Sequence, residues 1–165
     1  MGLIKTTPQE NNHINFLFSD LITMLEIREY EKASPKFISV FDHWLTREEV
    51  TEKLDKMNRH EHSLHSQKFQ NLWLHIYSQH AIYTYIKTHS QYFRIKTKEC
   101  LKTYFDNTYD KYYKDEPIFL IPDLFLVFMP ITDHTIMYFD NEFIEKSDFY
   151  GAVKNANLYI LDSQE

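Results

Sequence analysis

The sequence predicts an α+β fold: mostly helical, with about five helices, followed by a small antiparallel sheet and a C-terminal helix or strand. Two observations predict it. Helix start signals recur through the first part of the chain, and after Pro117 short β-branched and aromatic runs alternate with turn residues. The 165 residues suit a single domain, helical over 8–114 and β-rich and acidic over 117–165. Aromatic residues make up 16% of the chain, which favours a packed core over disorder.

Capping patterns mark the starts of the predicted helices. Thr7 and Thr46 each open a capping box, in which a threonine and a glutamate three residues later satisfy amides of the first helical turn. Apolar residues at helical spacing follow each box, and Thr97 can cap a further helix. The helices are expected over about residues 8–33, 35–45, 46–57, 63–89 and 97–114.

The pattern changes to strands after Pro117. The runs IFLI, LFLVFM and TIMYF are short and rich in β-branched and aromatic residues, and proline, aspartate and asparagine separate them. They predict two or three antiparallel strands. Ser147 can cap a last helix in DFYGAVKNANLY, while the final LYIL is compatible with a helix or a strand.

Several absences restrict the chemistry. Gly2 and Gly151 are the only glycines, whereas phosphate loops and nucleophile elbows need glycine, so no cofactor is expected. Cys100 is the only cysteine, which excludes an internal disulfide and a cysteine-based zinc site, and it is expected on an apolar helix face. Neither a signal peptide nor an apolar run of about 18 residues is found. A cytoplasmic protein without a membrane partner is expected.

The stretch NRHEHSLHSQK places three histidines close together. His62 and His65 could share a helical face, but His60 and His62 could not, and the HExxH spacing of zinc enzymes is missing. We interpret the stretch as a polar helix start rather than a metal site. One alternative stays open: a metal hydrolase that uses histidines of residues 60–89. Otherwise no catalytic residue is indicated, and the chain is not expected to be an enzyme.

Charge is distributed unevenly within the net charge of −6. Residues 115–165 contain ten acidic residues against two lysines, while 61–114 contain eight basic against four acidic residues. The acidic part is either an ordinary solvated surface or a docking face for a basic protein. The basic, tyrosine-rich segment 87–114 could form a nucleic-acid-binding or regulatory module, but helical spacing places several of its tyrosines on the apolar side. Nucleic acid is therefore the less favoured partner.

In overall character the chain resembles bacterial immunity proteins, the cognate inhibitors of secreted toxins. It is small, acidic, poor in glycine, rich in tyrosine and phenylalanine, and without a catalytic motif. The resemblance implies a basic toxin domain, often a nuclease, as partner; a phage inhibitor of a host nuclease would share this character. The runs MPITDHTIMYF and VKNANLYIL are also similar to the end of DUF4238, a bacterial family of unknown function. The histidine-rich, YVP-like opening of that family is absent here.

The expected interface lies in the turns of the acidic segment, where aromatic anchors stand among carboxylates. The predicted partner-binding residues are Asp133, Asp140, Glu142, Glu145, Asp148, Tyr138, Phe143 and Tyr150.

Overall fold

The computed structural model describes residues 2–101, 118–131 and 134–163 and shows an α+β fold, as predicted. The strands are β1 (Leu3–Lys5), β2 (Lys36–Ser39), β3 (Tyr83–Ile86), β4 (Gln91–Ile95), β5 (Ile118–Ile121), β6 (Leu126–Pro130), β7 (Thr135–Phe139) and β8 (Tyr159–Leu161). The longer helices are α1 (Pro8–Glu26), α3 (Arg59–Tyr77) and α6 (Ser147–Asn155). The short helices are η1 (Tyr30–Ala33), α2 (Arg47–Val50), η2 (Thr51–Asp55, a π-helix), η3 (Lys87–His89) and η4 (Pro122–Leu124).

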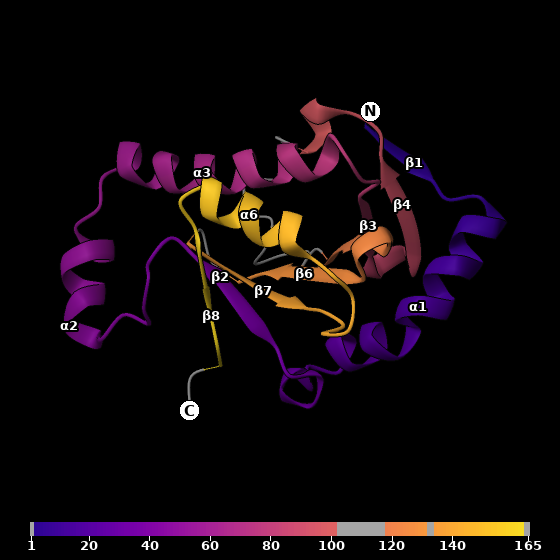
Figure 1. Cartoon of the computed structure of the whole chain (residues 1–165), viewed down its shortest axis with the longest axis horizontal. Coiled ribbons are helices and arrows are strands. Elements are labelled where there is room, and N and C mark those ends of the chain that lie inside the picture. The colour runs from indigo at the N-terminus through magenta and orange to yellow at the C-terminus, as the bar shows by residue number, and fades with distance from the viewer. Residues whose placement is uncertain (1, 102–117, 132–133, 164–165) are drawn as a thin grey trace.

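All eight strands form one antiparallel sheet in the order β1-β4-β3-β5-β6-β7-β2-β8. Helices α3 and α6 pack on one face and α1 packs on the other (Figure 1). The sheet therefore combines strands from the first part of the chain with strands from the acidic last part.

The length of α1 matches the distance across the sheet from β1 to β2. The helix leaves β1 at one edge and delivers the chain to β2, six strand positions away. At about 4.8 Å per strand that distance is roughly 29 Å. The 19 residues of α1 span about the same distance at 1.5 Å per residue. One helix thus crosses nearly the whole face, with Ile14, Phe18, Ile22 and Leu25 buried against it.

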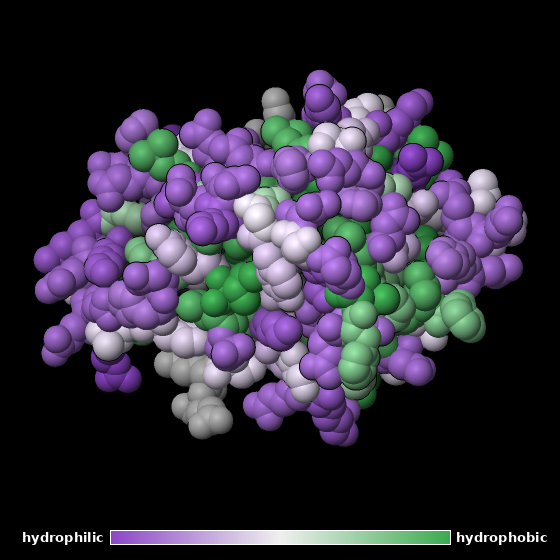
Figure 2. Space-filling model, in the orientation of Figure 1, coloured by the Kyte–Doolittle hydropathy of each residue, from purple (hydrophilic) through white to green (hydrophobic). Residues whose placement is uncertain are grey.

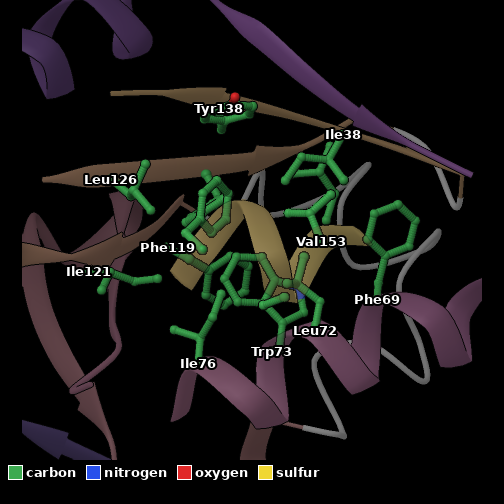
Figure 3. Packing of buried hydrophobic residues seen from close by; sticks show 14 of the residues in the cluster. Ile38, Phe69, Leu72, Trp73, Ile76, Phe119, Ile121, Leu126, Tyr138 and Val153 are labelled. Atoms are coloured by element: carbon green, nitrogen blue, oxygen red, sulfur yellow. The ribbon is translucent and has the colours of Figure 1, made fainter. Parts of the chain in front are cut away.

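The central strands are buried on both faces, which explains their uninterrupted apolar sequences. In β6, Leu126 and Phe128 face α3 and α6, whereas Val127 and Met129 face α1. These strands do not show the usual alternation of apolar and polar residues, because helices cover both faces of the sheet. Trp73 of α3 is fully buried in the core between the sheet and helices α3 and α6 (Figure 3). Its ring lies edge-on to the ring of Phe128, with the ring centroids 4.5 Å apart.

Two predictions about the order of elements are wrong: the helices do not precede the strands, and the sheet is not small. Residues 35–45 contain β2 instead of a helix, because the β-branched and aromatic run KFIS pairs with both β7 and β8. Helix α3 ends at Tyr77 and β3 follows, so the predicted helix over 63–89 stops early. Sheet pairing outweighs the local helical pattern in both places.

Other local predictions are confirmed. Thr7 and Thr46 both form complete capping boxes. Residues 98–101 are helical, with the Thr97 hydroxyl accepting from the Cys100 amide at 3.1 Å, and the rest of that predicted helix lies outside the described residues. The last helix is present as α6, but Ser147 begins it instead of capping it. Among the described helices, none combines the length and apolar character that a membrane crossing requires.

Candidate protein-docking surface

The loop between β7 and α6, residues 140–146, folds around a buried lysine. The Lys146 side chain is 1% exposed, and its Nζ atom donates to the carbonyl oxygens of Asn141 (2.8 Å) and Ile144 (2.9 Å). The same Nζ lies 3.3 Å from Asp140 Oδ2, which Lys36 Nζ of β2 approaches to 3.4 Å. Lys146 thereby fixes the loop to the sheet, because a buried ammonium group needs all of its acceptors.

Further hydrogen bonds order the outer part of this loop. The Asn141 side chain accepts from the Phe143 amide at 3.0 Å, and the Asn141 carbonyl accepts from the Ile144 amide at 3.0 Å. Glu145 Oε1 accepts from the Ser147 amide at 2.6 Å. Phe143 stands on this framework with 86% of its surface exposed. A large apolar side chain is thus presented by a backbone that is already fixed.

We define the acidic face as the exposed acidic and large apolar side chains of the loop 140–146 and of the first turn of α6. They are Glu142, Phe143, Ile144, Glu145, Asp148 and Tyr150. Hydrogen bonds from Ser147 hold the pKa of the Glu145 carboxyl below its usual value, so this group is charged at neutral pH. Apolar patches flank α6 between hydrophilic side chains (Figure 2). Apolar anchors within a charged rim are typical of protein interfaces.

Two of the predicted partner-binding residues do not belong to this surface. Tyr138 is 0% exposed, because its position in β7 turns the ring under α6 against Phe128 and Phe149. The Asp140 side chain is 7% exposed and bound to two lysines. Both residues support the fold and are not available for contact. Asp133 lies outside the described residues. The other five predicted residues are exposed and belong to the loop 140–146 or the first turn of α6.

A pocket lies beside the acidic face, between the end of α3 and the start of α6. It is a shallow hollow with room for about one water molecule. Apolar side chains that are buried or half-buried line it: Ile76, Leu124, Phe149 and Ala152. The polar lining residues are His75, Gln79, His80 and Asp148. We call it the α3–α6 pocket; Asp148 belongs to both the pocket and the acidic face.

The histidines of the pocket bear on the hydrolase alternative. His80 Nδ1 lies 3.2 Å from Asp123 Oδ2, an arrangement that can orient an imidazole ring. However, no serine, threonine or cysteine is among the residues that line this pocket. The lining thus offers His80, which Asp123 contacts from outside the pocket, without a nucleophile beside it.

The three histidines of the first turns of α3 are arranged as a polar helix start. Asn58 caps α3, with its Oδ1 atom accepting from the Glu61 amide at 2.9 Å. His60 is exposed, whereas the half-buried His65 ring packs edge-on against Phe41 at 5.6 Å. Within residues 2–101, 118–131 and 134–163, no three histidine, cysteine or acidic side chains are grouped so that they could hold a metal ion.

Sequence reasoning missed His43, which two carboxylates bracket. Its Nδ1 atom lies 2.6 Å from Asp42 Oδ1 and its Nε2 atom 2.7 Å from Glu49 Oε2. Hydrogen bonds to Asp42 and Glu49 raise the pKa of His43, and the same contact lowers the pKa of Glu49 to about 2. With both nitrogens committed to carboxylates, the ring is unsuited to act as a base or ligand. The run DHWLTREE contains both acids but does not show that they converge.

The basic segment 87–114 is described only in part. Lys87, Arg94, Lys96 and Lys98 lie at or near β4, and residues 102–114 are outside the described residues. Tyr83, Tyr85 and Tyr92 are buried in the core beneath α1, so they are not available to stack on bases. Cys100 packs against the other core, as expected.

Comparison with models of protein families, with curated proteins and with solved structures finds no match to this chain. The function is therefore argued from the geometry of the chain itself.

Proposed function

We propose that this protein is an inhibitor of the immunity type, which binds a basic bacterial toxin domain through its acidic face and blocks the partner's active or substrate-binding surface. The carboxylates of Glu142, Glu145 and Asp148 would guide the encounter, because complementary charge accelerates association and disfavours wrong partners. Phe143 and Tyr150 would supply the apolar contact that holds the complex.

The loop built around Lys146 carries this proposal. An exposed phenylalanine on a flexible loop would lose conformational freedom on binding, at about 0.5–1.5 kcal/mol for each immobilised side chain. Here the loop backbone is fixed before binding by three contacts of one buried ammonium group. Phe16 on α1 is equally exposed, but Phe143 differs in standing next to an exposed isoleucine, Ile144, and between two exposed carboxylates, Glu142 and Glu145. Partner binding supplies a reason for it.

The test is an affinity pull-down from the native cell, with washes at low and then high salt and identification of the retained proteins by mass spectrometry. The expected result is one basic protein held in stoichiometric amount, whose activity falls when this protein is added. The interface is then tested with a triple charge reversal, Glu142→Lys, Glu145→Lys and Asp148→Lys. Asp140 is left unchanged because it belongs to the buried ion cluster.

A matched control reverses three exposed acidic residues elsewhere: Asp20→Lys, Glu52→Lys and Asp55→Lys. Both variants change the net charge by the same amount, so only the position differs. The face variant is expected to bind at least about 100-fold more weakly, the control within about threefold. Equal losses would reduce the effect to net charge and overturn the acidic face as the interface. Retained nucleic acid that salt releases would instead favour a nucleic-acid-binding function.

A further inference from the structure

We infer that the segment from Asp42 to Glu49 is a proton-dependent clasp, which holds Trp44 at the end of β8 while His43 is charged and loosens when His43 is neutral. The inference does not depend on the proposed inhibitor function. It concerns the edge of the sheet at which β8 is the last strand and pairs with β2 (Figure 1).

The clasp closes a short loop of the chain. His43 Nδ1 lies 2.6 Å from Asp42 Oδ1, and His43 Nε2 lies 2.7 Å from Glu49 Oε2. Glu49 follows His43 by six residues, and Trp44 lies within the loop that their contact closes. The contact restricts the backbone of this loop, so it also restricts the position of Trp44.

Trp44 in turn attaches the end of β8 to the sheet. Its ring packs edge-on against the ring of Phe37 in β2, with the centroids 4.9 Å apart. Its Nε1 atom donates to the Asp162 carbonyl, directly after β8, at 2.8 Å. Strand β8 has only three residues, and its two outer residues are exposed. A short edge strand opens at a low cost in free energy, so the Trp44 contacts matter for its retention.

The charge on His43 decides which contacts its ring can make. A charged imidazole has two N–H donors, whereas a neutral one has a single donor and one lone pair, and carboxylates only accept. A neutral ring would therefore turn a lone pair toward a carboxylate oxygen of Asp42 or Glu49, and that contact breaks. The contact that remains loses the attraction between opposite charges. The loop is then held by fewer and weaker contacts.

The loosening is confined to the loop. Glu49 also accepts from the Thr46 amide and from Lys53 Nζ, both at 3.2 Å, and neither donor loses its proton when His43 does. The capping box at the start of α2 therefore persists when His43 becomes neutral. The clasp changes state without unfolding the elements on either side of it.

The direction of the pH dependence follows from the charged groups in contact with the ring. They are Asp42 in the loop and Glu49 in α2, with Lys53 of η2 reaching Glu49 from its other side. Hydrogen bonds to Asp42 and Glu49 raise the pKa of His43 above its usual value of about 6.5. The clasp is fully closed below about pH 6.5 and loosens as the pH rises through the raised pKa.

The test uses the fluorescence of the two tryptophans in the full chain. Trp73 is 0% exposed and Trp44 is half-buried, so the uncharged quencher acrylamide reports mainly on Trp44. The bimolecular quenching constant, corrected for the fluorescence lifetime, is measured from pH 5.5 to pH 9, and the His43 ring is titrated by NMR over the same range. The quenching constant is expected to rise about twofold, with the same midpoint as His43.

Variants separate the clasp from other titrations. His43→Gln is expected to remove the pH dependence, whereas His13→Gln on the exposed side of α1 should titrate like the native chain. Trp44→Phe should remove the quenching signal that changes with pH. Asp42→Asn takes away one of the two carboxylates and should lower the midpoint by about half a pH unit or more. A quenching constant that does not change with pH, or that changes equally in His43→Gln, would overturn the inference.

Discussion

Tyrosine hydroxyls on the two faces of the sheet differ in their hydrogen bonding. On the α1 face, the Tyr83 hydroxyl donates to Glu10 Oε2 at 2.7 Å and the Tyr85 hydroxyl donates to Glu26 Oε1 at 2.8 Å. On the α3/α6 face, the Tyr138 hydroxyl is buried and has no hydrogen-bond partner among the described residues. The buried tyrosines Tyr83 and Tyr85 of the first face thus combine packing with specific hydrogen bonds to α1, whereas Tyr138 of the second face is held by ring packing alone. The half-buried Tyr77 at the end of α3 does form a hydrogen bond on the second face, to the Lys96 carbonyl of the chain after β4.

This difference in hydrogen bonding reflects the contacts that attach α1 and α6 to the sheet. Glu10 lies in the first turn of α1 and Glu26 is its last residue, so the two tyrosines fix both ends of a helix that crosses the sheet. Helix α6 packs through Phe149, Ala152 and Val153, and the Lys146 cluster attaches its start to the sheet through ionic contacts. The loop of residues 140–146 thus lies at the polar contact between the sheet and the start of α6.

The largest effect is expected from Lys146→Met, which retains much of the side-chain volume but removes the charge. Asp140 would keep only Lys36, and the carbonyls of Asn141 and Ile144 would lose the Lys146 donor, while Asn141 keeps its bond from the Ile144 amide. Breaking a buried ion pair from one side typically costs 3–5 kcal/mol, and the remaining Lys36 contact places the expected loss of unfolding free energy at about 3 kcal/mol. Urea denaturation measures it. Lys154→Met on the exposed side of α6 is the control and should stay within about 0.5 kcal/mol.

Tyr83→Phe is expected to have the next largest effect. It removes the donor that helps to fix the start of α1 and leaves Glu10 with its Thr7 contacts. Because Glu10 retains contact with water, the expected loss is about 1–2 kcal/mol. Tyr159→Phe on the exposed edge strand is the control for the substitution itself. A loss no larger than that of the control would show that packing alone holds α1.

The raised pKa of Tyr83 also makes the free energy of unfolding depend on pH under alkaline conditions. Burial, with the Glu10 hydrogen bond second, raises the pKa of Tyr83 to about 12, against about 10 in the unfolded chain. Between these values the folded state retains a proton that the unfolded state has released, so unfolding free energy falls as pH rises. Urea midpoints at pH 9, 10 and 11 should fall less steeply for Tyr83→Phe than for the native chain. Parallel curves would contradict this assignment.

How much the sequence predicts depends on whether a signal is local. The capping boxes at Thr7 and Thr46 form as expected because all their atoms lie within four residues. Strand β2 is missed because its partners, β7 and β8, lie about a hundred residues away along the chain. The acidic segment indicates the docking surface, but sequence alone cannot separate exposed Glu142 from buried Asp140. That distinction depends on Lys36 and Lys146, which only the fold brings to Asp140.

The smallest effect is expected from Tyr138→Phe, the same substitution on the α3/α6 face. Burial raises the pKa of Tyr138, and its hydroxyl has lost water without gaining a partner among the described residues. Such a group costs roughly 1–3 kcal/mol, so removing it should leave stability unchanged or raise it by up to about 1 kcal/mol. The ring contacts with Phe128 and Phe149 remain. The same Tyr→Phe change is thus expected to destabilise the α1 face and not the α6 face. A loss above about 1 kcal/mol for Tyr138→Phe would mean that its hydroxyl is satisfied, and the two faces would then follow one rule.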